Sequence, residues 1–138
     1  MTKEMEKCIE TRQARVERIS EELLEVRFKP DLLVDGKGVG EAILAKRKLA
    51  AGAPHDVLMV LPQGAELDTR MVNMDPELHL GPCQASRRLA FVVPDEVNAQ
   101  LVGMHFRYHP RAFATEVFSA EEDARQWLAA QAMQAPLS

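Results

Sequence analysis

The feature that most constrains the fold is an unbroken apolar run, residues 57–61, with a proline close to each end. A half-exposed strand would alternate apolar and polar side chains, whereas a run without polar residues is typical of a strand buried on both faces of a parallel sheet. In open α/β sheets, ligands collect beyond the carboxyl ends of central strands. The loop after this strand, with Asp68, Thr69 and Arg70, is therefore the first place to look for function.

Length and charge exclude several classes of protein. A chain of 138 residues suits one domain that buries its core without disulfides or metal. The formal net charge of −4 argues against a nucleic-acid partner, and no apolar run approaches the roughly 20 residues of a membrane span. With two cysteines and a charged first ten residues in place of a secretory signal, we expect a cytoplasmic protein without a membrane partner.

The first part of the chain predicts two antiparallel strands. Residues 1–13 show no clear periodicity and are expected to be a flexible N-terminal segment. Apolar and charged residues then alternate in 14–19 and again in 24–28, where Glu25 and Arg27 would point outward. Only four residues separate the two stretches, which favours a hairpin.

The remaining chain alternates helices and strands. Helices are predicted from Asp35 to about residue 51, at Asp75-Pro76, over 95–108, and after the capping box Ser119-Ala-Glu-Glu122. Strands are predicted at 57–61, 88–93 and 115–118. This order predicts a single α/β domain over 14–131 and a C-terminal tail over 132–138. Its sheet would be mostly parallel, with about five strands, an N-terminal antiparallel hairpin and about four helices.

The succession of these segments resembles a known family. The stretch Phe113-Ala-Thr-Glu-Val-Phe-Ser-Ala-Glu-Glu-Asp-Ala-Arg-Gln-Trp-Leu128, together with the strands before it, is similar to the bacterial STAS-like, SpoIIAA-like domains of unknown function. The resemblance covers about residues 14–130 and implies strands added side by side, with no known enzyme activity. In related anti-sigma-factor antagonists, a partner kinase phosphorylates a serine after the loop aspartate. Thr69 holds that position here, although Arg70 and Met71 replace a small residue and glycine.

Other motifs favour structural roles. Gly36-x-Gly38-x-Gly40 has the wrong spacing for a dinucleotide fingerprint and is interpreted as a capping turn. Lys46 lies within the apolar face of its helix, where a lysine is expected to extend its ammonium group to water. The pairs His105/His109 and His79/Cys83 have a spacing that can bind metal, but prolines interrupt both, and a structural zinc site needs four ligands. We therefore expect neither a metal nor a cofactor.

Three functions remain open. The first is a non-enzymatic regulatory or protein-interaction domain with a protein partner, which the resemblance favours. The second is a binding protein for a small apolar, lipid-like ligand, which a sizeable apolar pocket would support. The third is a small hydrolytic enzyme using Asp68, Thr69 or His79, which is disfavoured because no base with a partner is evident.

The helix over 95–108 carries two apolar stripes. Val97, Leu101, Met104 and Tyr108 form the stripe that is expected to cover the sheet. The second stripe would then face a partner. It predicts a homodimer whose interface contains Ala99, Val102, Gly103 and Phe106.

Overall fold

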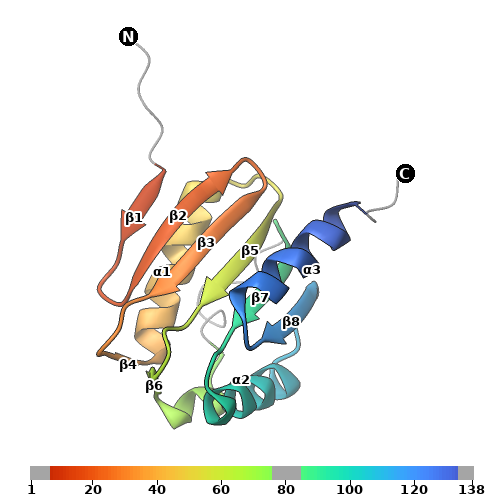
Figure 1. Cartoon of the computed structure of the whole chain (residues 1–138). Helices are drawn as coiled ribbons and strands as arrows, with labels where there is room; N and C mark the ends of the chain where they lie inside the picture. The colour runs from red at the N-terminus through yellow and green to blue at the C-terminus, as the bar shows by residue number, and fades with distance from the viewer. Residues whose placement is uncertain (1–6, 76–84, 134–138) are drawn as a thin grey trace.

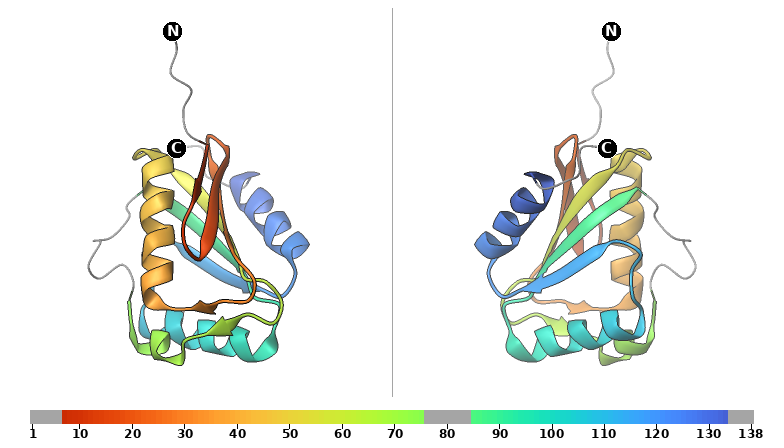
Figure 2. Two further views of the ribbon diagram at one scale, coloured as in Figure 1. Left: turned by 90° about the vertical axis from the view of Figure 1, so that its left-hand side faces the viewer. Right: turned by 90° about the vertical axis from the view of Figure 1, so that its right-hand side faces the viewer.

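The computed structural model of the chain describes residues 7–75 and 85–133. Within these residues, six strands form one sheet that α1 (Gly36–Ala50) covers on one face and α3 (Glu121–Met133) on the other. Helix α2 (Glu96–Tyr108) crosses one end of the sheet (Figures 1 and 2). The strands follow one another across the sheet in chain order. They are β1 (Cys8–Glu10), β2 (Ala14–Ser20), β3 (Leu23–Phe28), β5 (His55–Val60), β7 (Ser86–Val92) and β8 (Ala114–Phe118).

The sheet confirms the predicted α/β class and its mostly parallel arrangement. Strands β2 and β3 form the antiparallel hairpin, and β3, β5, β7 and β8 run parallel to one another. The apolar run does lie centrally, since β5 pairs with β3 on one side and β7 on the other. The sheet has one strand more than expected, because β1 pairs with β2 inside the segment that was expected to be flexible. Local periodicity cannot reveal a three-residue edge strand, which depends on its neighbour for hydrogen bonds.

Short elements lie at the carboxyl ends of the central strands. Strands β4 (Leu33–Val34) and β6 (Glu66–Leu67) pair in parallel, and the 3-10 helix η1 (Thr69–Asn73) follows. The described residues contain three α-helices in place of about four. The helix predicted at Asp75-Pro76 falls mainly on residues 76–84, outside the described part of the chain.

The glycine-rich start of α1 is a capping turn, as predicted. Asp35 is the N-cap, and its carboxylate accepts a hydrogen bond of 2.8 Å from the Gly38 amide. The side chain of Gln13 packs against this turn and donates to the Leu33 carbonyl oxygen and the Asp35 carboxylate. A Cβ atom on Gly38 would lie 1.7 Å from the Gln13 Oε1 atom, so this position needs glycine for close packing.

The two faces of the sheet have separate cores. On the α1 face, alternate residues of the central strands pack with α1 and α2, as Val57, Met59 and Leu89 show. On the α3 face, Leu58 and Ala90 pack against Leu128.

Two charged side chains predicted to point outward are partly covered by α3. Glu25 is only 6% exposed, and it accepts hydrogen bonds from Arg27 and Arg125. Arg27 also makes two hydrogen bonds to the carboxylate of Glu121, of 2.9 and 2.7 Å. The alternation of the strand was therefore right, but the charged face is closed by an ion-pair network with the last helix.

The predicted orientation of α2 is wrong. Val102 is only 8% exposed, and Ala99 and Phe106 pack against the core, whereas Val97 is 70% exposed. Phe106 makes an edge-to-face contact with Phe91 of β7. The stripe of Ala99, Val102, Gly103 and Phe106 was assigned to a partner, but its larger side chains are covered by this chain's own sheet. Homodimerisation itself stays a prediction.

None of the helices in residues 7–75 and 85–133 is long and apolar enough to cross a membrane.

Candidate functional site: an apolar cavity with a polar end

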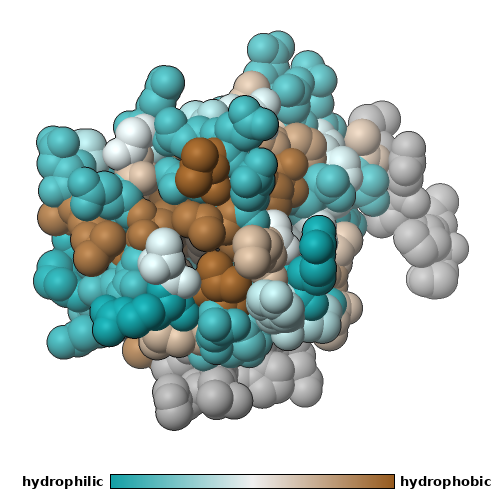
Figure 3. All heavy atoms as spheres, turned by 90° about the horizontal axis from the view of Figure 1, so that it is seen from below, coloured by the Kyte–Doolittle hydropathy of each residue, from teal (hydrophilic) through white to brown (hydrophobic). Residues whose placement is uncertain are grey.

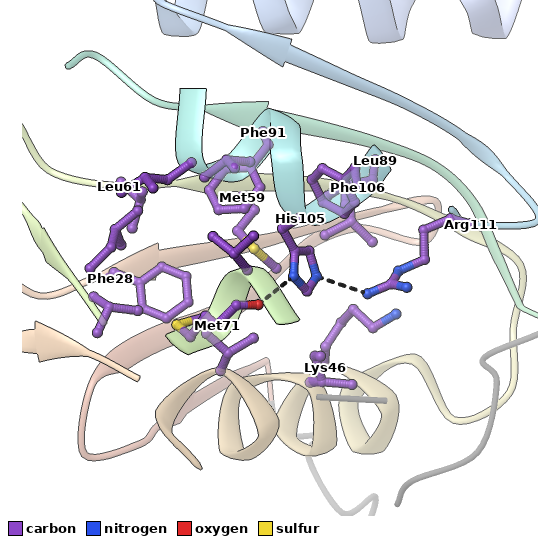
Figure 4. Close-up of a pocket in the computed structure, with 18 of the residues that line it drawn as sticks. Phe28, Lys46, Met59, Leu61, Met71, Leu89, Phe91, His105, Phe106 and Arg111 are labelled. Atoms are coloured by element: carbon purple, nitrogen blue, oxygen red, sulfur yellow. Dashed lines mark hydrogen bonds between the residues drawn. The ribbon is translucent and has the colours of Figure 1, made fainter. Parts of the chain in front are cut away.

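A cavity lies between α1, α2, η1 and the α1 face of the sheet (Figure 4). Its volume is about 100 Å³, several times the roughly 10–15 Å³ that one water requires. Most of its lining is apolar and comes from the central strands and α2, including Phe28, Val57, Met59, Leu61, Phe91 and Phe106. Seen from the end of the sheet where α2 lies, apolar side chains gather in the middle of the surface and hydrophilic ones surround them (Figure 3).

The arrangement of the helices explains the cavity. Helix α1 packs mainly on β1, β2 and β3, whereas α2 packs on η1 and β8. Strands β5 and β7 lie between the region that α1 covers and the region that α2 covers. On the α1 face of the sheet they carry Met59 and Phe91, which point toward the space that neither helix fills. The buried central strand predicted from the sequence thus forms the floor of the cavity.

Lys46 contributes to the polar end of the cavity. Its side chain was expected to reach water, but the residue is only 4% exposed, and the Nζ atom donates a hydrogen bond of 2.7 Å to the Ser86 hydroxyl oxygen. Ser86 is the first residue of β7, and the fold places it against the third turn of α1 as the buried polar partner of Lys46. The sequence around Lys46 cannot indicate this partner.

The hydrogen bond continues into the sheet through Ser86 and His55. The Nδ1 atom of His55 donates to the Ala53 carbonyl oxygen over 2.8 Å, so Nε2 is the acceptor that faces the Ser86 hydroxyl at 3.5 Å. Burial lowers the pKa of His55 and favours this neutral form. Because an ammonium group donates but cannot accept, the Ser86 oxygen accepts from Lys46, and the serine proton is directed toward His55 Nε2.

His105 and Arg111 form the other part of the polar end (Figure 4). His105 Nδ1 donates to the carbonyl oxygen of Met71 over 2.7 Å, and its Nε2 atom faces Arg111 Nη2 at 3.5 Å. Burial is the main cause that lowers the pKa of His105, and the positive charge of Arg111 lowers it further. The Arg111 side chain is only 10% exposed, and it donates to Asp75 at 3.3 Å while lying over the Phe106 ring.

The loop predicted to carry function lies beside this cavity. Asp68 lines the cavity, caps η1 by accepting from the Arg70 amide, and accepts three further hydrogen bonds, of 3.0, 3.1 and 2.7 Å, from the Arg70 guanidinium. These hydrogen bonds lower the pKa of Asp68. Thr69 and Arg70 are exposed, with Thr69 as the first residue of η1. The exposure of Thr69 is what a modification site requires, and its phosphorylation stays a prediction.

The described residues contain no group of three or more histidine, cysteine or carboxylate side chains that could hold a metal ion. The rings of His105 and His109 lie 5.0 Å apart, but the hydrogen bonds of His105 go to Met71 and Arg111. The second pair, His79 and Cys83, lies outside the described part of the chain.

Sequence reasoning identified the loop but missed the cavity. The residues of its polar end come from four separate segments: Lys46 from α1, Ser86 from β7, His105 from α2, and Arg111 from the turn before β8. The one available signal was a lysine on an apolar helix face, and it was assigned to solvent.

Comparison of the chain with protein-family models, with curated proteins and with solved structures found no match. The function is therefore inferred from the geometry of the cavity.

Proposed function

We propose that this protein binds a small, mostly apolar molecule in the cavity between α1, α2 and the central strands, and that it acts as a binding protein without catalysing a reaction. The observation that supports the proposal is the cavity itself, whose lining is apolar apart from a few polar groups at its ends. Ligand sites in proteins are commonly concave and apolar, with a few polar groups that set the ligand's orientation. Filling this space would bury apolar surface of both protein and ligand.

The proposal is compatible with the resemblance to STAS-like, SpoIIAA-like domains, which itself remains part of the proposal. The sequential strand order and the hairpin are what such a domain would have, and they support the resemblance only at the level of the α/β class. A regulatory role through a protein partner stays a prediction, with the exposed Thr69 and Arg70 as the residues to examine. The hydrolytic alternative, through Asp68, Thr69 or His79, also stays a prediction.

Titration of the full-length protein with the neutral fluorescent probe N-phenyl-1-naphthylamine tests the proposal. The expected result is saturable fluorescence enhancement with one site per chain, because the probe is apolar and compact. Absence of saturable binding to the folded protein would overturn the proposal.

Two variants on the same helix show whether the probe occupies the cavity. Leu101 lines the cavity, so Leu101→Trp should fill part of it and weaken probe binding about tenfold or more. Val97 lies on the outer side of α2 and is 70% exposed, so Val97→Trp adds the same bulk to the surface and should leave binding unchanged. Equal affinity of both variants would place the probe elsewhere.

A further inference from the structure

We propose that two copies of this protein associate through the outer face of α2, with the two α2 helices antiparallel about a two-fold axis that passes beside Leu101 and Met104. The partner is a second copy of the same chain. The inference goes beyond the proposed function, and its test requires no ligand. It follows from the placement of exposed apolar and charged side chains on α2.

Exposed apolar side chains are concentrated at the end of the sheet where α2 lies. Eight large apolar residues are exposed in the described part of the chain, and six of them belong to α2 or to the segments around β4 and η1. Figure 3 shows this end as a group of apolar side chains surrounded by hydrophilic ones. Such a surface is typical of an interaction site. The six residues are Leu32, Leu33, Met74, Val97, Met104 and Tyr108.

On α2 the exposed apolar residues form one stripe. Val97 is 70% exposed, Tyr108 59% and Met104 40%. Leu101, which is half-buried, completes the stripe. Its members recur after three or four residues, the spacing with which one helix packs along another. The chain's own sheet packs on the opposite side of α2, around Val102, so the stripe faces away from it.

The stripe is complementary to an antiparallel copy of itself. When the axis passes between positions 102 and 103, Leu101 faces Met104 of the partner subunit, and Val97 faces Tyr108 of the partner subunit. Each apolar residue of one helix therefore meets an apolar residue of the other. Leu101 and Met104 lie at the centre of the contact, whereas Val97 and Tyr108 lie at its ends, where truncation has little effect.

The charges beside the stripe favour the same arrangement. Glu96 and Arg107 are both exposed, and neither forms an ion pair with another residue in the described part of the chain. They are eleven residues apart, about three full helical turns, so they lie on the same flank of α2.

An antiparallel copy brings opposite charges together on this flank. Glu96 would lie about 3 Å along the helix axis from Arg107 of the partner subunit, because the two positions are offset by two residues. The symmetry creates this attraction twice. In a parallel pair in register, Glu96 would lie beside Glu96 of the partner subunit, and the like charges would repel. The charge pattern therefore favours an antiparallel copy of the same helix.

Sedimentation velocity of the full-length wild type from about 1 to 200 µM measures the association. We expect a monomer–dimer equilibrium with a dissociation constant of roughly 10 µM, because a surface built mainly on one helix is small for a specific interface. A wild type that is monomeric over the whole range would overturn the inference.

Two substitutions of exposed apolar residues locate the interface. Met104→Lys places a charge at the centre of the contact and should leave the protein monomeric over the same range, with an unchanged circular dichroism spectrum. Leu44 lies on α1 and is 52% exposed, so Leu44→Lys makes a similar change elsewhere and should dimerise like the wild type. A folded Met104→Lys protein that still dimerises, or equal loss in both variants, would overturn the assignment to α2.

Exchange of charges tests the antiparallel register. Glu96→Arg and Arg107→Glu each place like charges at both contacts, so each should weaken dimerisation about tenfold. An equimolar mixture of the two variants again pairs opposite charges and should form a heterodimer with about the wild-type affinity. Asp123→Arg makes the same change of charge in the first turn of α3 and should leave dimerisation unchanged. A mixture as weak as the single variants, or equal weakening by Asp123→Arg, would overturn this register.

Discussion

The His105 imidazole donates a hydrogen bond of 2.7 Å from Nδ1 to the main-chain carbonyl oxygen of Met71, and this bond joins α2 to η1 at the wall of the cavity. The bond fixes the tautomer, so that Nε2 faces the guanidinium of Arg111 as an acceptor. A proton on Nε2 would replace this attraction with repulsion between two cations. The protonation state of His105 therefore affects the shape of the cavity.

We expect the protein to lose stability as the pH falls below about 6.5, the ordinary pKa of histidine. Burial lowers the pKa of both His55 and His105, so the unfolded chain takes up protons at a higher pH than the folded protein. Between the two pKa values the unfolded state binds more protons, and each histidine removes at most about 1.4 kcal/mol of stability per pH unit of decrease. Urea unfolding at pH 7.5, 6.5 and 5.5 measures this slope.

Substitution identifies the groups responsible for that slope. His105→Gln should reduce the pH dependence between 6.5 and 5.5, and the double variant His55→Gln/His105→Gln should reduce it further. A double variant with the wild-type slope would show that other groups cause the loss.

A second, more acidic transition is expected from the ion pair between Arg27 and Glu121. Hydrogen bonding to Arg27 lowers the pKa of Glu121 from 4.5 to about 2, so its stabilising contribution is complete above pH 4.5 and is lost as the pH falls toward 2. Since the Glu121 side chain is 34% exposed and partly screened, Glu121→Gln should cost about 1 kcal/mol or less at pH 7. Thermal unfolding from pH 7 to 3 should show the wild type and the variant converging.

The control for this pair is Asp123→Asn, which removes an exposed carboxylate from the same helical turn. It should leave stability within about 0.5 kcal/mol of the wild type. Similar losses in both variants would mean that net charge, and not the contact with Arg27, determines the effect.

Gly38→Ala should destabilise the fold by about 1–3 kcal/mol, the usual cost of overpacking. The added Cβ would lie 1.7 Å from Gln13 Oε1, and displacing Gln13 would break its hydrogen bonds to Leu33 and Asp35. Gly40 lies in the same helix, and a Cβ atom added there would have no atom of the described residues within 4 Å. Gly40→Ala should therefore raise the free energy of unfolding by up to about 1 kcal/mol, because alanine has the higher helix propensity. Urea unfolding of the two variants measures both changes in stability. Changes of the same sign in both variants would contradict the packing of Gln13.

The orientation of α2 is tested by two identical truncations. Val102 is 8% exposed, so Val102→Ala should lower the free energy of unfolding by about 1–2.5 kcal/mol, because apolar contacts with the core disappear. Val97 is 70% exposed, so Val97→Ala should stay within about 0.5 kcal/mol of the wild type. Chemical denaturation provides both values, and a larger loss at Val97 would mean that the helix presents its other stripe to the sheet.

The sequence alone determined the features that depend on local pattern. The apolar run at 57–61 indicated a buried central strand, because no alternating strand or surface helix accommodates such a run, and β5 occupies that place. The hairpin and the capped start of α1 at Asp35 were equally predictable, since turn length and the capping side chain act within a few residues. Together these features established the α/β class.

Only the tertiary structure decided which surfaces meet. Lys46 was assigned to solvent, yet it donates to Ser86, a residue 40 positions away. The two stripes of α2 are similar in apolarity, so the choice between Val97 and Val102 depends on where the end of the sheet places the helix. The cavity arises in the same way, as the space between helices that pack on different strands. Its lining residues are distant in sequence and become a site only when the sheet brings them together.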